Sequence, residues 1–228
     1  MGTIVYMLFD FDNMRLADRG QILALMNALA ENDRYRFLKK AIVCDDMPGE
    51  IYVPNTPELL DRAWSNAVRA APRYNGQYWM EFENASGLRI GFGYDPRKLK
   101  RLNLSIDKDA LKLPGSAPNA AELVNVIGII ANTLAPAYGY GLFNYDIHDL
   151  QPVGAAPQGV WDYNLLGSKL VEQWGHVLES LPAAVTRFEN GSALVSMSDE
   201  PFAGYREAAP RYKQAAQQLG LNAVFHDG

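Results

Sequence analysis

The sequence has almost none of the residues that build disulfides and metal centres. Its 228 residues include one cysteine, Cys44, and three histidines. One cysteine cannot form an intramolecular disulfide, which is typical of a reducing compartment, although a disulfide-free periplasmic protein would have the same count. At this length a single core buries roughly 70% of the surface that the unfolded chain exposes, so the fold needs no covalent staple.

Long apolar runs are also missing. The most apolar window, residues 120–137, is interrupted by Glu122, Asn125, Asn132 and Thr133, whereas a membrane-spanning helix needs roughly 20 apolar residues in succession. The first ten residues have no basic segment and no small-residue cleavage site, so they predict a strand and not a signal peptide. We expect no membrane association and a cytoplasmic location.

An excess of positive charge is absent as well. The formal net charge is −5, and a protein that binds nucleic acid must neutralise phosphates with lysine and arginine. We therefore expect no nucleic-acid partner. An acidic balance favours encounter with a basic protein, or it simply keeps the chain soluble.

Signatures of ligand binding are missing from most of the chain. It has no phosphate-binding loop, dinucleotide fingerprint or nucleophile elbow. Asp146, His148 and Asp149 offer metal-ligand atoms, but neither His176 nor His226 has a spacing that would complete a site. A catalytic metal needs at least three converging ligands. We expect no metal and no cofactor, and we expect these side chains to be solvated.

Asp10-Phe-Asp12 is the sharpest enzyme-like motif, and it follows an apolar run. It resembles the start of haloacid-dehalogenase-type phosphatases, in which a nucleophilic Asp and an acid/base Asp stand two residues apart after a buried strand. That resemblance implies a Mg²⁺-dependent phosphohydrolase with Asp10 as nucleophile and Asp12 as acid/base. The sequence continues with Asn13, where that family has glycine, and no suitable lysine follows downstream. The favoured interpretation is that the two acids cap the turn after the strand.

Five stretches of the sequence have the pattern of a helix. In each, apolar residues recur at spacings of three and four, and in several a capping residue or a first-turn proline comes before them. The expected helices begin near Asp18, Thr56, Asn119, Leu166 and Pro210, and the last is expected to end at Gly220.

Apolar runs of strand length lie between these helices. The expected strands cover residues 3–11, 35–44, 77–83, 88–94, 101–107, 137–146 and 221–225. Because only short turns separate the runs between residues 77 and 107, at least this part of the sheet should be antiparallel. The sequence thus predicts an α+β fold, with a largely antiparallel sheet or sheets and about five helices. We expect one domain over residues 1–228. The alternative is a division of this domain into two sub-halves, 1–112 and 119–228, joined by the Pro/Gly linker 113–118.

The strongest local signal is a β-hairpin near the end of the chain. Residues 184–188 and 192–197 are short apolar-alternating runs on either side of Asn190-Gly191. Asn-Gly favours a two-residue turn in which both central residues have positive φ. The sequence predicts a hairpin closed by that turn.

Aromatic residues gather before this hairpin. Tyrosines alternate with glycines from residue 138 to 145, and Trp161-Asp-Tyr163 follows. Tyr and Trp combine a large contact area with a polar atom and are enriched at binding hot spots. The candidate partner-binding residues, chosen by residue type alone, are Tyr138, Tyr140, Tyr145, Trp161, Asp162 and Asp199. The alternative is that the rings fill the core between sheet and helices.

Residues 119–225 present an ordered set of features. A helix over 119–134 leads into the Tyr-Gly strand, and Trp174 precedes Leu181-Pro182. The hairpin follows, then Asp199-Glu-Pro-Phe202 and a helix that ends at Leu219-Gly-Leu221. This order resembles the bacterial toxin-immunity proteins, most nearly the immunity protein 52 family.

The resemblance implies a function without catalysis. A protein of this kind is a bacterial, cytoplasmic immunity protein that binds a cognate antibacterial toxin, delivered by type VI secretion or another polymorphic toxin system, and covers its active site. The family supplies no catalytic residues. The alternatives are the phosphohydrolase described above and a structural adaptor subunit of a secretion or phage system.

Overall fold

The computed structural model describes most of a large sheet and the helices around it. The described residues are 4–10, 19–31, 40–43, 51–52, 58, 65, 69, 72, 78–83, 88–94, 101–107, 120–143, 157, 159–197 and 205–221. Within them, ten strands form one sheet, and the helices are α1 (Arg19–Ala30), α3 (Ala120–Leu134), α4 (Ser168–Leu178) and α5 (Tyr205–Leu219). The predicted α+β class is confirmed. Of the helix expected near Thr56, the described residues Glu58, Ser65 and Arg69 are helical.

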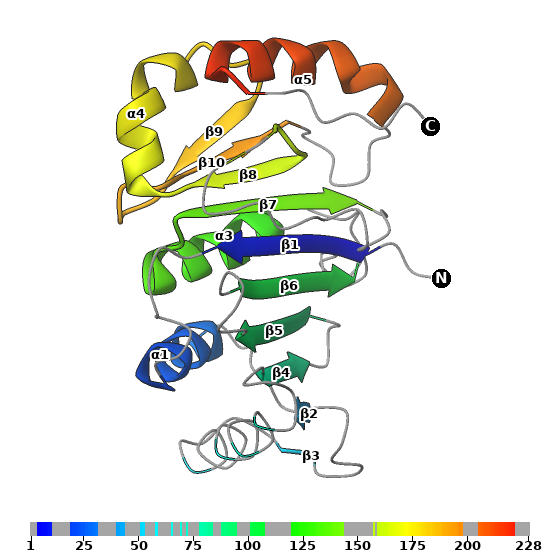
Figure 1. The fold of residues 1–228 in the computed structure, drawn as a ribbon, viewed down its shortest axis with the longest axis vertical. Helices are drawn as coiled ribbons and strands as arrows, with labels where there is room; N and C mark the ends of the chain where they lie inside the picture. The colour runs from blue at the N-terminus through cyan, green and yellow to red at the C-terminus, as the bar shows by residue number, and fades with distance from the viewer. Residues whose placement is uncertain are drawn as a thin grey trace.

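The sheet places its first strand at the centre. β1 (Ile4–Asp10) pairs with β6 (Arg101–Asp107) on one side and with β7 (Tyr138–Phe143) on the other (Figure 1). From edge to edge the strands are β3 (Ile51–Tyr52), β2 (Lys40–Val43), β4 (Tyr78–Glu83), β5 (Leu88–Tyr94), β6, β1, β7, β8 (Tyr163–Leu166), β10 (Ala193–Ser196) and β9 (Ala184–Arg187). Every neighbouring pair is antiparallel, which confirms the predicted largely antiparallel sheet.

The two expected sub-halves share this sheet. The strands before residue 112 occupy one part of it, those after residue 119 occupy the other, and the β1–β7 ladder joins them. The predicted linker 113–118 lies outside the described residues, and the division into one or two domains stays a prediction.

One face of the sheet carries the apolar side chains of its central strands. Phe9 of β1 lies opposite Leu102 of β6 and Gly139 of β7, and both apolar side chains are fully buried. A Cβ at Gly139 would stand 2.6 Å from the Phe9 ring, so this glycine leaves the space that the ring fills. Helix α3 lies on the same face, where its Gly128 meets the ring of Phe188, directly after β9.

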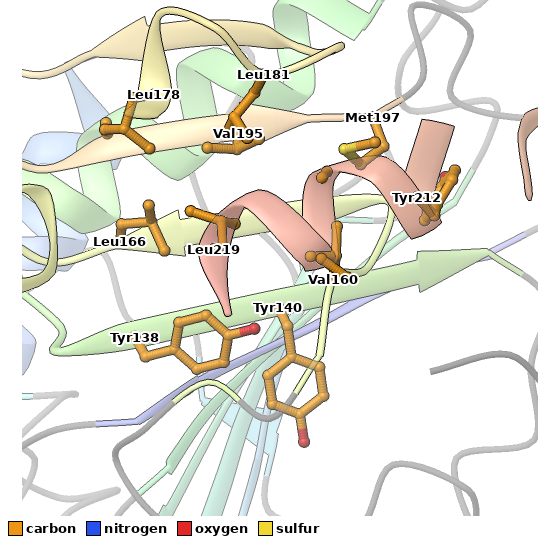
Figure 2. Close-up of a cluster of buried hydrophobic side chains, with 13 residues drawn as sticks. Tyr138, Tyr140, Val160, Leu166, Leu178, Leu181, Val195, Met197, Tyr212 and Leu219 are labelled. Carbon is orange, nitrogen blue, oxygen red and sulfur yellow. The ribbon is translucent and has the colours of Figure 1, made fainter. Parts of the chain in front are cut away.

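The opposite face of β7, β8 and β10 is covered by α4 and α5. Figure 2 shows the cluster of buried side chains between them, to which Tyr138 comes from the sheet and Tyr212 and Leu219 come from α5. Complete burial of a large apolar side chain contributes roughly 1.5–3 kcal/mol. This cluster therefore holds α5 against the sheet.

The segment around Leu166 differs from its prediction. The expected helix from Leu166 begins two residues later, and residues 163–166 form β8, whose side chains are all buried. A strand buried on both faces does not alternate between polar and apolar residues. Leu166 therefore fitted the helical spacing of the apolar residues in α4, and the helix was predicted to begin too early. A Cβ at Gly167, between the two elements, would stand 2.7 Å from the carbonyl oxygens of Pro136 and Ala137.

Helices α3 and α5 both end in left-handed residues. Ala135 has φ +46° and donates its N–H to the carbonyl of Ala131 at 2.9 Å. After α5, Gly220 has φ +67° and Leu221 donates its N–H to the carbonyl of Ala216 at 2.8 Å, which is a Schellman motif. The predicted end of this helix at Gly220 is confirmed.

The predicted start of α5 is wrong. The helix begins at Tyr205, so Pro210 lies inside it and not at its first turn. Proline in a helix removes one hydrogen bond, here to the carbonyl four residues earlier. Tyr212, Ala215 and Ala216 are buried immediately downstream, and their packing offsets this loss.

The predicted hairpin is confirmed, but its turn is of another type. β9 and β10 pair antiparallel, and Phe188 donates its N–H to the carbonyl of Ser192 at 2.9 Å, which leaves three residues in the loop. Gly191 has φ +83°, whereas the φ of Asn190 is not positive. A type I turn followed by a left-handed glycine has this geometry. Asn190 keeps negative φ because its side chain is bonded elsewhere, as described below.

Candidate partner-binding site

The predicted partner-binding residues divide by burial. The side chains of Tyr138, Tyr140 and Asp162 are only 2%, 5% and 3% exposed, and Trp161 is half-buried. Tyr145 and Asp199 lie outside the described residues. The structure thus favours the alternative interpretation for the two described tyrosines, which fill the core. A direct role of any of the six in partner binding stays a prediction.

The aromatic side chains form a stack that runs from the core to the surface. The ring centroids of Tyr138 and Tyr140 are 5.7 Å apart, and those of Tyr140 and Trp161 are 5.2 Å apart. The planes meet at 23° and 27°, which is an offset-stacked arrangement. Trp161 is the outer member of this stack, so it alone of the three offers ring surface to a partner.

Asp162 connects the sheet to α5. Its carboxylate accepts a hydrogen bond from the hydroxyl of Tyr212, which is also buried. Its backbone carbonyl accepts the N–H of Met197 at 2.8 Å, which extends the β8–β10 ladder. A buried carboxylate that makes hydrogen bonds inside the protein stabilises one packing arrangement. We interpret Asp162 as a residue that positions α5, with Asn164 fixing the adjacent turn through two bonds to the backbone of Trp161.

The enzyme-like motif lies at the end of the central strand. Asp10 is the last residue of β1, where its Cα is in register with Arg101 and Tyr138, and Asp12 lies outside the described residues. In open sheets of parallel strands, ligands bind beyond the carboxyl ends of the strands. Because both neighbours of β1 are antiparallel, the sheet forms no such edge beside Asp10. This topology counts against the phosphohydrolase alternative.

Metal-ligating residues do not gather in the part of the chain that the structure describes. In that part, no group of three His, Cys, Asp or Glu side chains could hold an ion. His176 is exposed in the last turn of α4, whereas Cys44, Asp146, His148, Asp149 and His226 are not described. No helix of the described part is long and apolar enough to cross a membrane.

A surface that the sequence did not point to is formed by α4 and β9, and we name it the α4–β9 surface. Helix α4 presents half-buried apolar side chains, Leu170, Val171, Trp174 and Val177, beside exposed polar ones. β9 is the last strand of the sheet, and none of its four side chains is fully buried. Arg187 joins the two elements through an ion pair with Glu179, with 2.7 Å between Nη2 and Oε1.

The Arg187–Glu179 pair contributes little to stability. The side chains are 49% and 72% exposed, and exposed pairs typically contribute less than about 1 kcal/mol. Its effect is geometric, because it holds the Arg187 side chain towards the end of α4. Sequence reasoning missed this surface because a strand becomes an edge only through the order of the sheet.

Comparisons with known proteins bear on the fold. The class is α+β, with one continuous antiparallel sheet and helices on both faces. A solved structure of this kind is the Pseudomonas aeruginosa T6SS protein PA0821, with a TM-score of 0.59 and 12% sequence identity, over 100% of this chain and 77% of that one. At this identity the likeness concerns the fold alone. No protein-family model and no curated protein matches the sequence, so the assignment to the immunity protein 52 family stays a prediction.

Proposed function

We propose that this chain is a type VI secretion immunity protein. It binds one cognate antibacterial toxin in the cytoplasm of the bacterium that produces both, and it neutralises the toxin without turnover. The observation that carries the proposal is the likeness of the entire chain to a T6SS protein, PA0821. The order of features over residues 119–225 supports the finer step from this secretion system to an immunity role.

The described surface is suited to a protein partner. The fully buried side chains lie between the sheet and its helices, whereas the α4–β9 surface combines half-buried aliphatic and aromatic side chains with exposed charges. Interfaces between proteins have this composition, with an apolar centre and a polar rim. The net charge of −5 favours a basic toxin.

Rescue of growth tests the proposal. The product of the gene beside the one that encodes this chain is expressed in bacteria, alone and together with the chain. We expect the product alone to stop growth, and co-expression of the chain to restore growth to the level of cells without the product. A toxin from an unrelated secretion locus serves as control and should not be neutralised, because immunity requires a specific interface.

The same assay separates immunity from catalysis. An Asp10→Asn variant should rescue growth as well as the wild type does, since the proposed function needs no nucleophile. Failure of the wild-type chain to rescue, or rescue that disappears in Asp10→Asn while the variant remains folded, would contradict the proposal.

A further inference from the structure

The outer edge of β9 has a defined hydrogen-bonding polarity. Opposite residues in an antiparallel pair alternate between bonded and non-bonded positions. Phe188 and Ser192 are bonded across the hairpin, so Thr186 and Ala184 are the β9 residues that bond to β10. The N–H and C=O groups of Val185 and Arg187 therefore point away from the sheet.

The next ladder gives the same result independently. Met197 donates its N–H to Asp162 of the segment before β8, so Val195 and Ala193 direct their backbone groups towards β8. Val195 and Ala193 are in register with Val185 and Arg187. Backbone groups of Val195 and Ala193 that face β8 cannot also bond to β9. Within the part of the chain that the structure describes, Val185 and Arg187 have no further backbone partner.

The edge is also firmly held. Phe188, which follows β9, packs its ring against Gly128 of α3, and Asn190 donates from Nδ2 to the carbonyl of Ala131 at 2.6 Å. Val185 packs against the cluster beneath α4 and α5. A strand that is fixed at the turn of its hairpin and by the packing of Val185 loses little conformational freedom when it binds, which favours affinity.

Protection against strand pairing is weak at this edge. Natural edge strands are blunted by proline, by bulges or by charged side chains that block the approach of another strand. β9 contains no proline, it pairs with β10 in unbroken register, and the ion pair with Glu179 draws its one charged side chain towards α4. Both Ala184 and Arg187 are exposed.

The charges around the edge indicate which charged residues a docking segment should contain. Glu172, Glu179 and Glu189 are exposed around the edge, and so are Arg187 of β9 and Arg211, which donates from Nε to the carbonyl of Pro182 at 3.1 Å. A segment with lysine or arginine can pair with the three glutamates, and the net charge of −5 of the whole chain steers such a segment to this protein. The alternating backbone donors and acceptors require that segment to be extended, because only a strand matches their spacing.

We propose, resting on the immunity function above, that the outer edge of β9 is the docking edge for the toxin. An extended, basic segment of the toxin pairs with Val185 and Arg187 and continues the ten-stranded sheet. Side chains of that segment on the face covered by α4 and α5 lie on the same side of the sheet as the half-buried apolar residues of α4.

A matched pair of variants tests the docking edge. Val185→Pro removes the outward N–H and places the proline ring where a partner strand would lie, while it leaves the bonds to β10 intact. Val185→Ala loses the same packing contacts but keeps the N–H. The probe is the toxin used in the rescue assay, titrated by calorimetry. We expect Val185→Pro to bind roughly 10- to 100-fold more weakly than Val185→Ala, because a buried backbone carbonyl of the toxin loses its donor.

Amide exchange in the wild-type complex provides a second measurement that needs no variant. The amides of Val185 and Arg187 should exchange at least about tenfold more slowly when the toxin is bound, because they then donate to its backbone. Replacing both Glu172 and Glu189 with lysine should weaken binding several-fold at low salt and less at high salt.

The possible results separate this inference from the proposed function. Wild type that does not bind the toxin contradicts the function itself. Wild type and Val185→Pro that bind equally, with unchanged exchange at both amides, contradict the docking edge and leave the function standing. Self-association of the free chain that Val185→Pro abolishes would show that a second copy occupies the edge, which also overturns the inference. Binding that is insensitive to the two lysine substitutions would contradict a basic segment.

Discussion

Two glycines, Gly167 before α4 and Gly175 within it, show how the surroundings of a residue decide the effect of one added methyl group. Gly167 is buried between β8 and α4, and it donates its N–H to the carbonyl of Ala137 at 3.0 Å. A Cβ there would meet two backbone oxygens at 2.7 Å, and backbone atoms cannot turn aside as a flexible side chain can. Gly175, in the middle of α4, has open space around the same position.

Alanine substitutions at these glycines should therefore have opposite effects. Gly167→Ala should lower the free energy of unfolding by about 2 kcal/mol or more, because the close contact forces the strand and the Ala137 segment apart. Gly175→Ala should raise it by about 0.5–1 kcal/mol, since alanine restricts the unfolded chain and favours the helix. Urea denaturation of both variants and the wild type provides the comparison. A destabilised Gly175→Ala, or a neutral Gly167→Ala, would contradict the packing described here.

At the scale of elements, the hairpin tip is bound to the end of α3. Asn190 donates from Nδ2 to the carbonyl of Ala131, which the N–H of Ala135 also uses, and its Oδ1 accepts from the N–H and the hydroxyl of Ser192. One side chain thus closes the turn and gives a second donor to a carbonyl in the last turn of α3, 59 residues earlier.

Substitutions at Asn190 should separate these two effects. Asn190→Asp keeps the acceptor for Ser192 but loses the donor, and it places a negative charge at the negative end of the α3 dipole. It should lower the free energy of unfolding by about 2–3 kcal/mol. Asn190→Ala, which brings no charge, should lower it by about 1–2 kcal/mol. Thermal unfolding followed by circular dichroism gives both values, and an Asp variant as stable as the wild type would contradict the contact with α3.

Elements with a local signal were predictable from the sequence. The hairpin, the apolar helix before Ala135 and the glycine after α5 each depend on neighbouring residues, so pattern and turn chemistry suffice. The type of the turn was not predictable, because tertiary bonds of Asn190 select it. The start of α5 was missed because buried Tyr212 and Ala216 stabilise a helix that Pro210 alone would oppose.

At the scale of the whole molecule, the order of the sheet decides which residues are accessible. β1 lies at the centre of the sheet and the hairpin lies at one end, so β9 is an edge although the next strand in the sequence, β10, is completely buried. Sequence reasoning selected the tyrosines and Asp162 by residue type, and it could not see that β8 and α5 cover them. The surface available to a partner follows from topology, and a single sequence contains little information on long-range pairing.

The surface to which we assign the toxin in the proposed function is rigid. Each described strand pairs with a neighbour in the sheet, and the hairpin that forms the exposed edge is fixed to α3. Such a surface docks with little rearrangement, as in complexes between enzymes and their inhibitors, which are among the tightest known. If the toxin is basic, as we propose, steering by the acidic charge adds to the rate of association.

The most direct test of the central claim is the affinity of the purified chain for the product of the adjacent gene. Calorimetric titration should give a stoichiometry of one to one and a dissociation constant on the order of 10 nM or lower, the range of an interface that must silence a toxin. Loss of toxin activity should follow the bound fraction in the same titration. An absence of binding at about 10 μM, or binding that leaves the toxin fully active, would contradict the account.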